Sequence, residues 1–331
     1  MDQPPLNGTE RAVLGAVAVV QVRQTLDRYL QRHAGAGLDE VLFRAGRIDA
    51  VWAVRIRDGR DVVVKAHRPP VDLVGRRAAV RAQRLLLAAG FPCPEQISGP
   101  DAFEGLVLSV ELLVRDGDVA DARDPRIRRS GAAGLAAHVQ ILRRHPELLD
   151  VAGPGPAWCR YQAGPWPVPH DTIFDFSSTP PGYAWLDQLA EEAADRLVGA
   201  DHSDPVVGHA DWYVNNLRFD GGRLVAAFDW DLCANPEPVL VGLSAGGFTA
   251  SGTSGYSCPS VAEVVGFAED YESAAGRRFG EVGKRAVAAA TTWVLAFNAR
   301  CELALLTGDP HPRGNLTALA EHGLDYLELR W

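Results

Sequence analysis

The residues that could do chemistry are concentrated in one stretch near the middle of the chain, residues 206–233. Five polar side chains in this stretch could act together: an imidazole, an amide and three carboxylates, on His209, Asn216, Asp211, Asp229 and Asp231. Two short apolar runs, 216–219 and 224–228, flank the Gly-containing segment 220–223, and this pattern predicts a β-hairpin. Because a hairpin brings its two ends together, we expect these polar side chains to lie in a small volume.

Such a set of side chains suits phosphoryl transfer. Mg²⁺ prefers oxygen ligands, and a carboxylate and an amide on opposite sides of a hairpin can supply them. A separate carboxylate can then take the proton from an attacking hydroxyl group. Protein kinases use this arrangement, with a catalytic Asp, an Asn shortly after it and a metal-binding Asp further along the chain.

Two segments, 209–216 (HADWYVNN) and 229–231 (DWD), resemble a family motif. They are similar to the His-x-Asp-x-x-x-x-Asn and Asp-x-Asp pair of the aminoglycoside phosphotransferase and choline kinase-like family. The resemblance implies an O-phosphotransferase that uses ATP or GTP with Mg²⁺. Its acceptor would be a hydroxyl group of a small molecule, such as an aminoglycoside-like antibiotic, an amino sugar or a related metabolite.

The resemblance also implies a role for each residue of the motif. Asp211 would be the catalytic base, and His209 would position the catalytic loop through hydrogen bonds. Asn216 and Asp229 would hold the magnesium ion. Asp231 would support the metal site through water or cap the following turn.

The fold implied by the resemblance is α+β and protein kinase-like, with a small β-rich N-lobe and a larger, mainly helical C-lobe. At 331 residues the chain is long enough for two lobes. We expect an N-terminal helical segment at 1–37 that packs on the N-lobe, with Thr9 as the N-cap of one helix to about Arg32. The nucleotide-binding N-lobe would span 38–113 and the catalytic, substrate-binding C-lobe 114–331, with ATP in the cleft between the lobes.

Lys65 is the candidate contact to the nucleotide phosphates. Short strand patterns are predicted at 41–43, 51–56 and 61–66, and Lys65 lies on the third. The chain has only two lysines, against 31 arginines, and a compact ammonium can touch phosphate oxygens as a point charge. A charge at a strand edge that faces water is the alternative interpretation.

Two further nucleotide contacts follow from the resemblance. The turn 44–50 lies where the phosphate-covering loop of the family is expected, and Gly46 is its only glycine. The run 106–114 predicts a strand that leads into a hinge. There the backbone of Glu111 to Leu113, within a residue or two, would form hydrogen bonds to adenine.

One expected feature is missing from the predicted helix at 71–90. The resemblance implies a Glu in this helix that pairs with Lys65, but no acidic residue follows Asp72 there. Either Gln83 orients the lysine as a neutral acceptor, or a carboxylate from elsewhere takes this place. The missing acid also leaves open a nucleotide-binding pseudokinase without transfer activity.

The bulk properties of the chain exclude several classes of protein. The net charge of −9 argues against a nucleic-acid or anionic-membrane binder and is compatible with a cationic acceptor. The five cysteines are scattered without a Cys-x-x-Cys pair, so we expect reduced thiols in a cytoplasmic protein rather than a zinc site or disulfides. We also expect no membrane segment, and a monomer or a dimer.

A serine hydrolase is the third hypothesis. The segment 242–246 (GLSAG) matches the Gly-x-Ser-x-Gly nucleophile elbow, with Ser244 as the nucleophile and the preceding run 239–241 as its strand. However, the chain has no His-Gly-Gly-Gly oxyanion segment, and the expected alternation of strands and helices upstream is absent. We therefore rank this hypothesis below the two kinase-like ones.

Overall fold

The computed structural model of the chain describes residues 4–15, 17–164, 166–200 and 202–331. The chain divides into two compact units. Unit 1 consists of Met1–Ala88 and Cys93–Arg115, and unit 2 consists of Ala89–Pro92 and Asp116–Trp331. A short segment, Ala89–Pro92, therefore belongs to unit 2 although the residues on both sides of it belong to unit 1.

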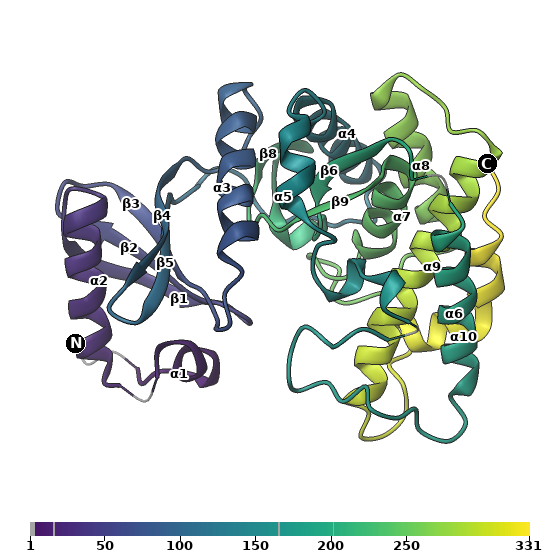
Figure 1. Cartoon of the computed structure of the whole chain (residues 1–331), viewed down its shortest axis with the longest axis horizontal. Coiled ribbons are helices and arrows are strands. Elements are labelled where there is room, and N and C mark those ends of the chain that lie inside the picture. Colours follow the sequence, from purple (N-terminus) through teal and green to yellow (C-terminus); the bar gives the residue numbers. More distant parts are fainter. Residues whose placement is uncertain (1–3, 16, 165, 201) are drawn as a thin grey trace. The chain divides into compact units, whose positions relative to one another are not determined.

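Unit 1 is built on a five-stranded antiparallel sheet with the strand order β1-β2-β3-β5-β4 (Figure 1). Its elements are α1 (Gly8–Leu14), α2 (Val19–His33), β1 (Leu38–Ala45), β2 (Ala50–Ile56), β3 (Asp61–Ala66), α3 (Leu73–Ala88), β4 (Gln96–Phe103) and β5 (Leu106–Leu112). The continuous valine run of β3 fits its central position, because this strand is buried on both faces.

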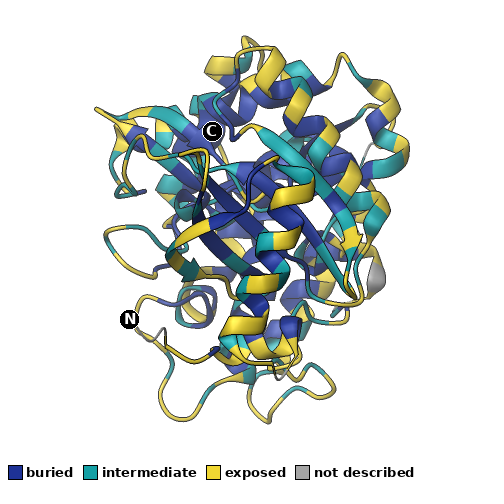
Figure 2. Cartoon of the chain, turned by 90° about the vertical axis from the view of Figure 1, so that its left-hand side faces the viewer, coloured by how far each residue is buried: buried dark blue, intermediate teal, exposed yellow. Residues whose placement is uncertain are grey.

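The pairing of β3 with β5 determines which side chains share a face of the sheet. Val63 pairs with Glu111, and Lys65 pairs with Ser109. Because side chains alternate along a strand, these four residues point to the same face. The other face forms a buried core with the N-terminal helices, which includes Leu26, Tyr29, Trp52, Val64 and Leu108. Figure 2 shows how much of this sheet is buried.

The N-terminal segment differs from the single helix predicted between Thr9 and about Arg32. It forms two helices, α1 and α2, and the N-cap of the first is Asn7. The Asn7 side chain accepts a hydrogen bond from the Glu10 amide at 2.8 Å, and the Glu10 carboxylate accepts one from the Asn7 amide at 2.8 Å. This reciprocal capping favours a start before Thr9. Gly15, with a φ of 82°, ends the first helix.

Unit 2 is mainly helical (Figure 1). Its helices are α4 (Pro125–Leu142), α5 (Leu149–Ala152), α6 (Ala184–Val198), α7 (Glu237–Gly247), α8 (Val261–Ala275), α9 (Glu281–Ala304) and α10 (Asn315–Leu327). The long helix α9 packs against α6, α7 and α10, and most of its alanine-rich sequence is buried. Two small antiparallel pairs complete the unit: β6 (Pro205–His209) with β9 (Leu232–Pro236), and β7 (Leu217–Asp220) with β8 (Arg223–Ala227).

The predicted fold class is confirmed: a β-sheet unit is followed by a mainly helical one. The predicted hairpin is present as β7 and β8, within a residue or two of the expected bounds. Strand β4 was not predicted, since its sequence QISGPDAF lacks a clear alternation. In the part of the chain that the structure describes, no helix has both the length and the apolar character required to span a bilayer.

Candidate active site

Two antiparallel pairs in unit 2 hold the segment His209–Asn216 and residues 229–231 together. At the end of β6, His209 pairs with Leu232 of β9, and the next amide, of Ala210, donates to the Asp231 carbonyl at 2.7 Å. At the start of β7, the Asn216 carbonyl accepts the Phe228 amide at 3.0 Å. The sequence predicted only the β7–β8 hairpin. The β6–β9 pair, which joins strands that are more distant in the sequence, closes the other side of the site.

His209 is buried, with an exposed fraction of 1%. Its Nδ1 accepts the backbone amide of Asp211 at 3.0 Å, so the ring proton must be on Nε2. Nε2 lies 3.2 Å from the carbonyl of Phe228, to which it donates. Both ring nitrogens therefore form hydrogen bonds to backbone groups of the segments at 211 and 228.

A second buried histidine lies behind the loop. His138 of α4 accepts the backbone amide of His209 on its Nε2 at 3.2 Å, and it packs against Trp212 and Trp230. Burial lowers the pKa of His138 to about 3, and the neighbouring His209 contributes to this shift. His138 is therefore neutral and supports the segment His209–Asn216 from inside the unit. It was not identified from the sequence, where nothing distinguishes it from other core residues.

Asp211 is held by the amide of Asn216. The Asn216 Nδ2 group donates to Asp211 Oδ2 at 2.9 Å and to the Asp211 carbonyl at 3.0 Å. Burial raises the pKa of Asp211, and the negative charges of Asp229 and Asp231 raise it further, to about 7, although the hydrogen bond from Asn216 acts in the opposite direction. The charges of Asp229 and Asp231 are thus close enough to disfavour the ionised form of Asp211.

Asp229 has a strained backbone, with a φ of 63°. Few non-glycine residues adopt this conformation, although Asp does so more readily than most, and such residues are common at functional sites. The next residue, Trp230, is buried, donates from Nε1 to the Ala227 carbonyl at 2.9 Å, and packs 4.7 Å from the His209 ring. Anchoring of Trp230 therefore fixes the direction of Asp229.

The residues present fit a divalent cation. The amide nitrogen of Asn216 is used by Asp211, which leaves its Oδ1 as the atom suited to a metal. The crowded carboxylates would gain from a cation nearby. Among the described residues, no group of three or more His, Cys, Asp or Glu side chains could hold a metal. A site with one amide and one carboxylate would therefore complete its shell with water and substrate oxygens, as Mg²⁺ sites commonly do.

In unit 1, Lys65 meets a carboxylate that does not come from α3. Lys65 Nζ lies 3.0 Å from Glu111 Oε1, and the two side chains are 14% and 8% exposed. The sequence left two partners open for Lys65, Gln83 or a carboxylate from outside the helix. The structure shows the second. The amide of Leu113 donates to the Asp61 carbonyl at 3.0 Å, so this donor is used within the sheet.

The turn that contains Gly46 is tight. Gly46 has a φ of 105°, and a Cβ at this position would lie 2.0 Å from the Asp49 carbonyl oxygen. Asp49 anchors the turn: its carboxylate lies 2.7 Å from His67 Nδ1 and accepts the Arg68 amide at 2.9 Å. His67 Nε2 in turn lies 3.0 Å from Ser109 Oγ. This chain of contacts was missed, because only the sheet register brings these residues together.

Ser244 does not form a nucleophile elbow. It lies inside helix α7, which starts before the predicted strand 239–241, and its exposed fraction is 4%. An elbow requires an exposed serine at a turn from strand to helix. The geometry therefore gives no support to the hydrolase hypothesis.

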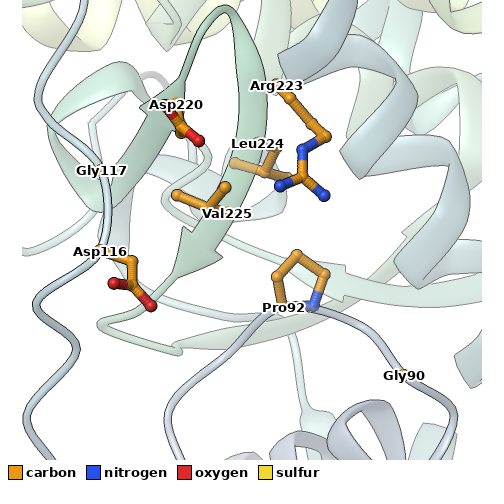
Figure 3. A pocket seen from close by; sticks show the side chains of 8 residues that line it. All are labelled: Gly90, Pro92, Asp116, Gly117, Asp220, Arg223, Leu224 and Val225. Carbon is orange, nitrogen blue, oxygen red and sulfur yellow. The ribbon is translucent and has the colours of Figure 1, made fainter.

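A hollow of about 500 Å³ lies in unit 2 at the tip of the β7–β8 hairpin (Figure 3). It is lined by Gly90, Pro92, Asp116, Gly117, Asp220, Arg223, Leu224 and Val225. The hairpin tip is at the opposite end of β7 from Asn216. None of the candidate catalytic residues lines this hollow.

Comparison with known proteins gave one family and several structural neighbours. A family model described as "Phosphotransferase enzyme family" matches residues 39–239. Amicoumacin kinase hAmiN, solved with AMP-PNP, Ca²⁺ and Ami, is 12% identical with a TM-score of 0.65, covering 93% of this chain and 95% of that one.

Two other neighbours have similar coverage. A putative aminoglycoside phosphotransferase from Ralstonia eutropha JMP134 is 15% identical with a TM-score of 0.56, covering 92% of this chain and 98% of that one. Macrolide 2′-phosphotransferase MphH from Brachybacterium faecium is 18% identical with a TM-score of 0.51, covering 93% and 96%. At these identities the likeness shows the fold. A search of curated proteins gave no match.

Proposed function

Because the chain belongs to the phosphotransferase enzyme family, we propose that it is an ATP-dependent O-phosphotransferase that acts on a hydroxyl group of a small molecule. The observation that carries this proposal is the contact between Asn216 Nδ2 and Asp211 Oδ2 at 2.9 Å, beside the strained Asp229. It supports a cluster of one candidate base and two candidate metal ligands, in which Asn216 is buried and Asp229 is exposed.

Asp211 is the catalytic base in this proposal. Its carboxylate takes the proton of the acceptor hydroxyl, while the hydroxyl oxygen forms a bond to the γ-phosphorus of ATP. The bond from that phosphorus to the β–γ bridging oxygen breaks, and ADP leaves. A base with a pKa of about 7 suits this task near neutral pH. His209 fixes the backbone of Asp211, as its hydrogen bonds indicate.

Asn216 and Asp229 are the proposed ligands of Mg²⁺, which would supply positive charge against the phosphates. Lys65 is the proposed contact to the nucleotide phosphates. The turn that contains Gly46 is proposed to cover these phosphates. The adenine contact is expected at Glu111 to Leu113, within a residue or two, and we assign it to the backbone just after Leu113, because the Leu112 and Leu113 amides donate to Glu95 and Asp61. The proposed nucleotide is ATP or GTP. The AMP-PNP and Ca²⁺ of the amicoumacin kinase complex support a nucleoside triphosphate and a divalent metal.

The acceptor class follows from the neighbours and the charge. The names of the neighbouring structures include an amicoumacin, an aminoglycoside and a macrolide kinase. These names support a hydroxylated antibiotic, an amino sugar or a related metabolite as the acceptor. The net charge of −9 favours a cationic member of this class.

A phosphorylation screen tests the proposal. The protein is incubated with Mg²⁺, ATP or GTP labelled at the γ-phosphate, and a panel of aminoglycosides, macrolides, amino sugars and choline-like amines. We expect one acceptor class to become labelled. Asp211→Ala should abolish labelling while nucleotide binding, measured by calorimetry, is kept. Asp220→Ala, which removes an exposed carboxylate at the hairpin tip, is the matched control.

Two results would change the conclusion. Labelling that persists in Asp211→Ala would remove this residue from the chemistry. Nucleotide binding with no labelled acceptor across the panel would favour the pseudokinase.

A further inference from the structure

The contact between Lys65 and Glu111 is built into the sheet of unit 1. The two residues lie on adjacent antiparallel strands, β3 and β5, where Lys65 pairs directly with Ser109 and Glu111 with Val63. They are therefore diagonal neighbours on one face, a separation that two long side chains can bridge. Their charged ends meet at 3.0 Å.

Two glutamine amides hold the Glu111 carboxylate in place. Gln96 of β4, which pairs with Glu111, donates from Nε2 to Glu111 Oε2 at 2.6 Å. Gln83 of α3 lies 3.4 Å from the same oxygen, and it also donates to the Pro94 carbonyl at 3.1 Å. One carboxylate oxygen thus faces Lys65 and the other faces amide donors. A buried carboxylate with a cation on one side and hydrogen bonds on the other is strongly oriented.

Helix α3 contributes an amide here, not an acid. The sequence of Leu73–Ala88 contains no Asp or Glu, and Gln83 is the helix residue that reaches Glu111. In a kinase whose lysine is paired by a helix acid, moving the helix breaks the pair. In this chain both members of the pair belong to neighbouring strands of a five-stranded sheet. The ion pair itself therefore joins two neighbouring strands and does not cross from the sheet to α3.

We propose that Glu111 is the positioning residue for Lys65, in the place of a helix acid, and that this ion pair between neighbouring strands holds Lys65 ready for nucleotide. The proposal rests on the proposed function, because it assumes that Lys65 meets nucleotide phosphates. It gives the side chain of Glu111 a role separate from any contact of its backbone with adenine.

The scarcity of lysine provides a direct readout. The chain has only Lys65 and Lys284, so protein labelled with ¹³C-lysine gives two sets of side-chain NMR signals. A Lys65→Arg variant assigns them, and Lys284 in unit 2 is the internal reference. The signal of Lys65 reports its electrostatic surroundings whether or not an acceptor for phosphate is known.

Three variants separate the strand carboxylate from the helix contact. Glu111→Gln keeps the shape and removes the charge. Glu111→Gln with Gln83→Glu moves the acid to the helix, onto the residue that contacts Glu111 Oε2 at 3.4 Å. Gln83→Ala removes the helix contact but leaves Glu111. Glu95→Gln, at an exposed acid just before β4, is the matched control.

We expect Glu111→Gln to shift the Lys65 signal and to raise the KM for ATP by roughly 10- to 100-fold, the range for a lost hydrogen bond to a charged group. The double variant should restore both values in part, and Glu95→Gln should change neither. Gln83→Ala should leave the Lys65 signal at its wild-type position. If Glu111→Gln does not fold, the double variant, which has the net charge of the wild type, is compared with Gln83→Ala instead. The Lys65 signal should differ from the wild type in the double variant and stay unchanged in Gln83→Ala.

Two results would overturn the proposal. One is an unchanged Lys65 signal and ATP KM in Glu111→Gln. The other is an equal shift in Gln83→Ala, which would make the helix the positioning element. Failure of the proposed function gives a different result: no acceptor is labelled, yet AMP-PNP still shifts the Lys65 signal in the wild type and shifts it less in Glu111→Gln.

Discussion

The burial of Asp211 and, after it, the nearby carboxylates of Asp229 and Asp231 predict that the site costs stability at neutral pH in the absence of a divalent cation. The perturbation that tests this is Asp211→Asn, which removes a negative charge and keeps a group able to contact Asn216. The pKa of Asp211 is raised from 3.8 to about 7. Its contribution to stability is therefore fully present below pH 3.8 and is lost as the pH rises through about 7.

The magnitude follows from linkage. At pH 5.5 the folded protein keeps the Asp211 proton, whereas the unfolded chain has lost it. Each unit of pKa difference corresponds to about 1.4 kcal/mol. Between pH 5.5 and pH 8 the wild type should therefore lose about 2 kcal/mol of unfolding free energy through this group. The variant lacks the titration, so its stability relative to the wild type should rise by about 2 kcal/mol over the same interval.

Urea unfolding in the presence of EDTA, at pH steps from 5.5 to 8, measures this difference. Tryptophan fluorescence is a suitable signal, since seven of the eight tryptophans lie in unit 2. Asp220→Asn is the control, because it removes an exposed carboxylate from the same hairpin. Added Mg²⁺ should reduce the difference, since a nearby cation favours the ionised carboxylates. A difference that is constant across pH would refute the electrostatic reasoning.

Three further predictions concern the supports of the site. Gly46→Ala should lower thermal stability and ATP affinity more than Gly59→Ala. Both glycines have positive φ, but only at Gly46 would the new Cβ meet backbone, at 2.0 Å from the Asp49 carbonyl; equal losses would show that backbone strain alone matters. His138→Gln should make the free energy of unfolding less dependent on pH below neutrality. Because the pKa of His138 is about 3, the wild type should lose about 2 kcal/mol of unfolding free energy between pH 8 and pH 5. Urea unfolding at both pH values measures this loss, and an equal loss in the variant would contradict the prediction. Asp49→Asn should destabilise unit 1 by roughly 1–3 kcal/mol through weaker contacts to His67 and the Arg68 amide, and an unchanged melting temperature would contradict this.

The parts of the site that were predictable from sequence are local. The residues from 209 to 216 and at 229 belong to one hairpin and its flanks, and the spacing alone placed them near each other. The strand of Lys65 was likewise predicted with its observed bounds, Asp61–Ala66, because a short apolar run after a turn is a strong signal. Short-range patterns carry this information without any knowledge of the packing around them.

The contacts that sequence reasoning could not place depend on register between distant strands. Ser109 meets His67, and Glu111 meets Lys65, only because β3 and β5 pair with one particular offset. A slip of one residue would turn these side chains to the core face. The pattern of β5 could not have revealed this, since its sequence LVLSVEL is mostly apolar and fits a buried strand in either orientation.

A missing helix acid is therefore weak ground for calling a kinase-like chain inactive. The physical requirement is a carboxylate within reach of the lysine ammonium, and a sheet offers such a position two residues along the neighbouring strand. In this chain that position is Glu111, and the place on α3 that could have carried the acid is occupied by Gln83, which contacts the same carboxylate. When α3 is considered alone, Gln83 looks like the loss of the acid that pairs with the lysine. When β5 is considered with it, Gln83 is an amide donor to Glu111, the carboxylate that pairs with Lys65 in place of that acid.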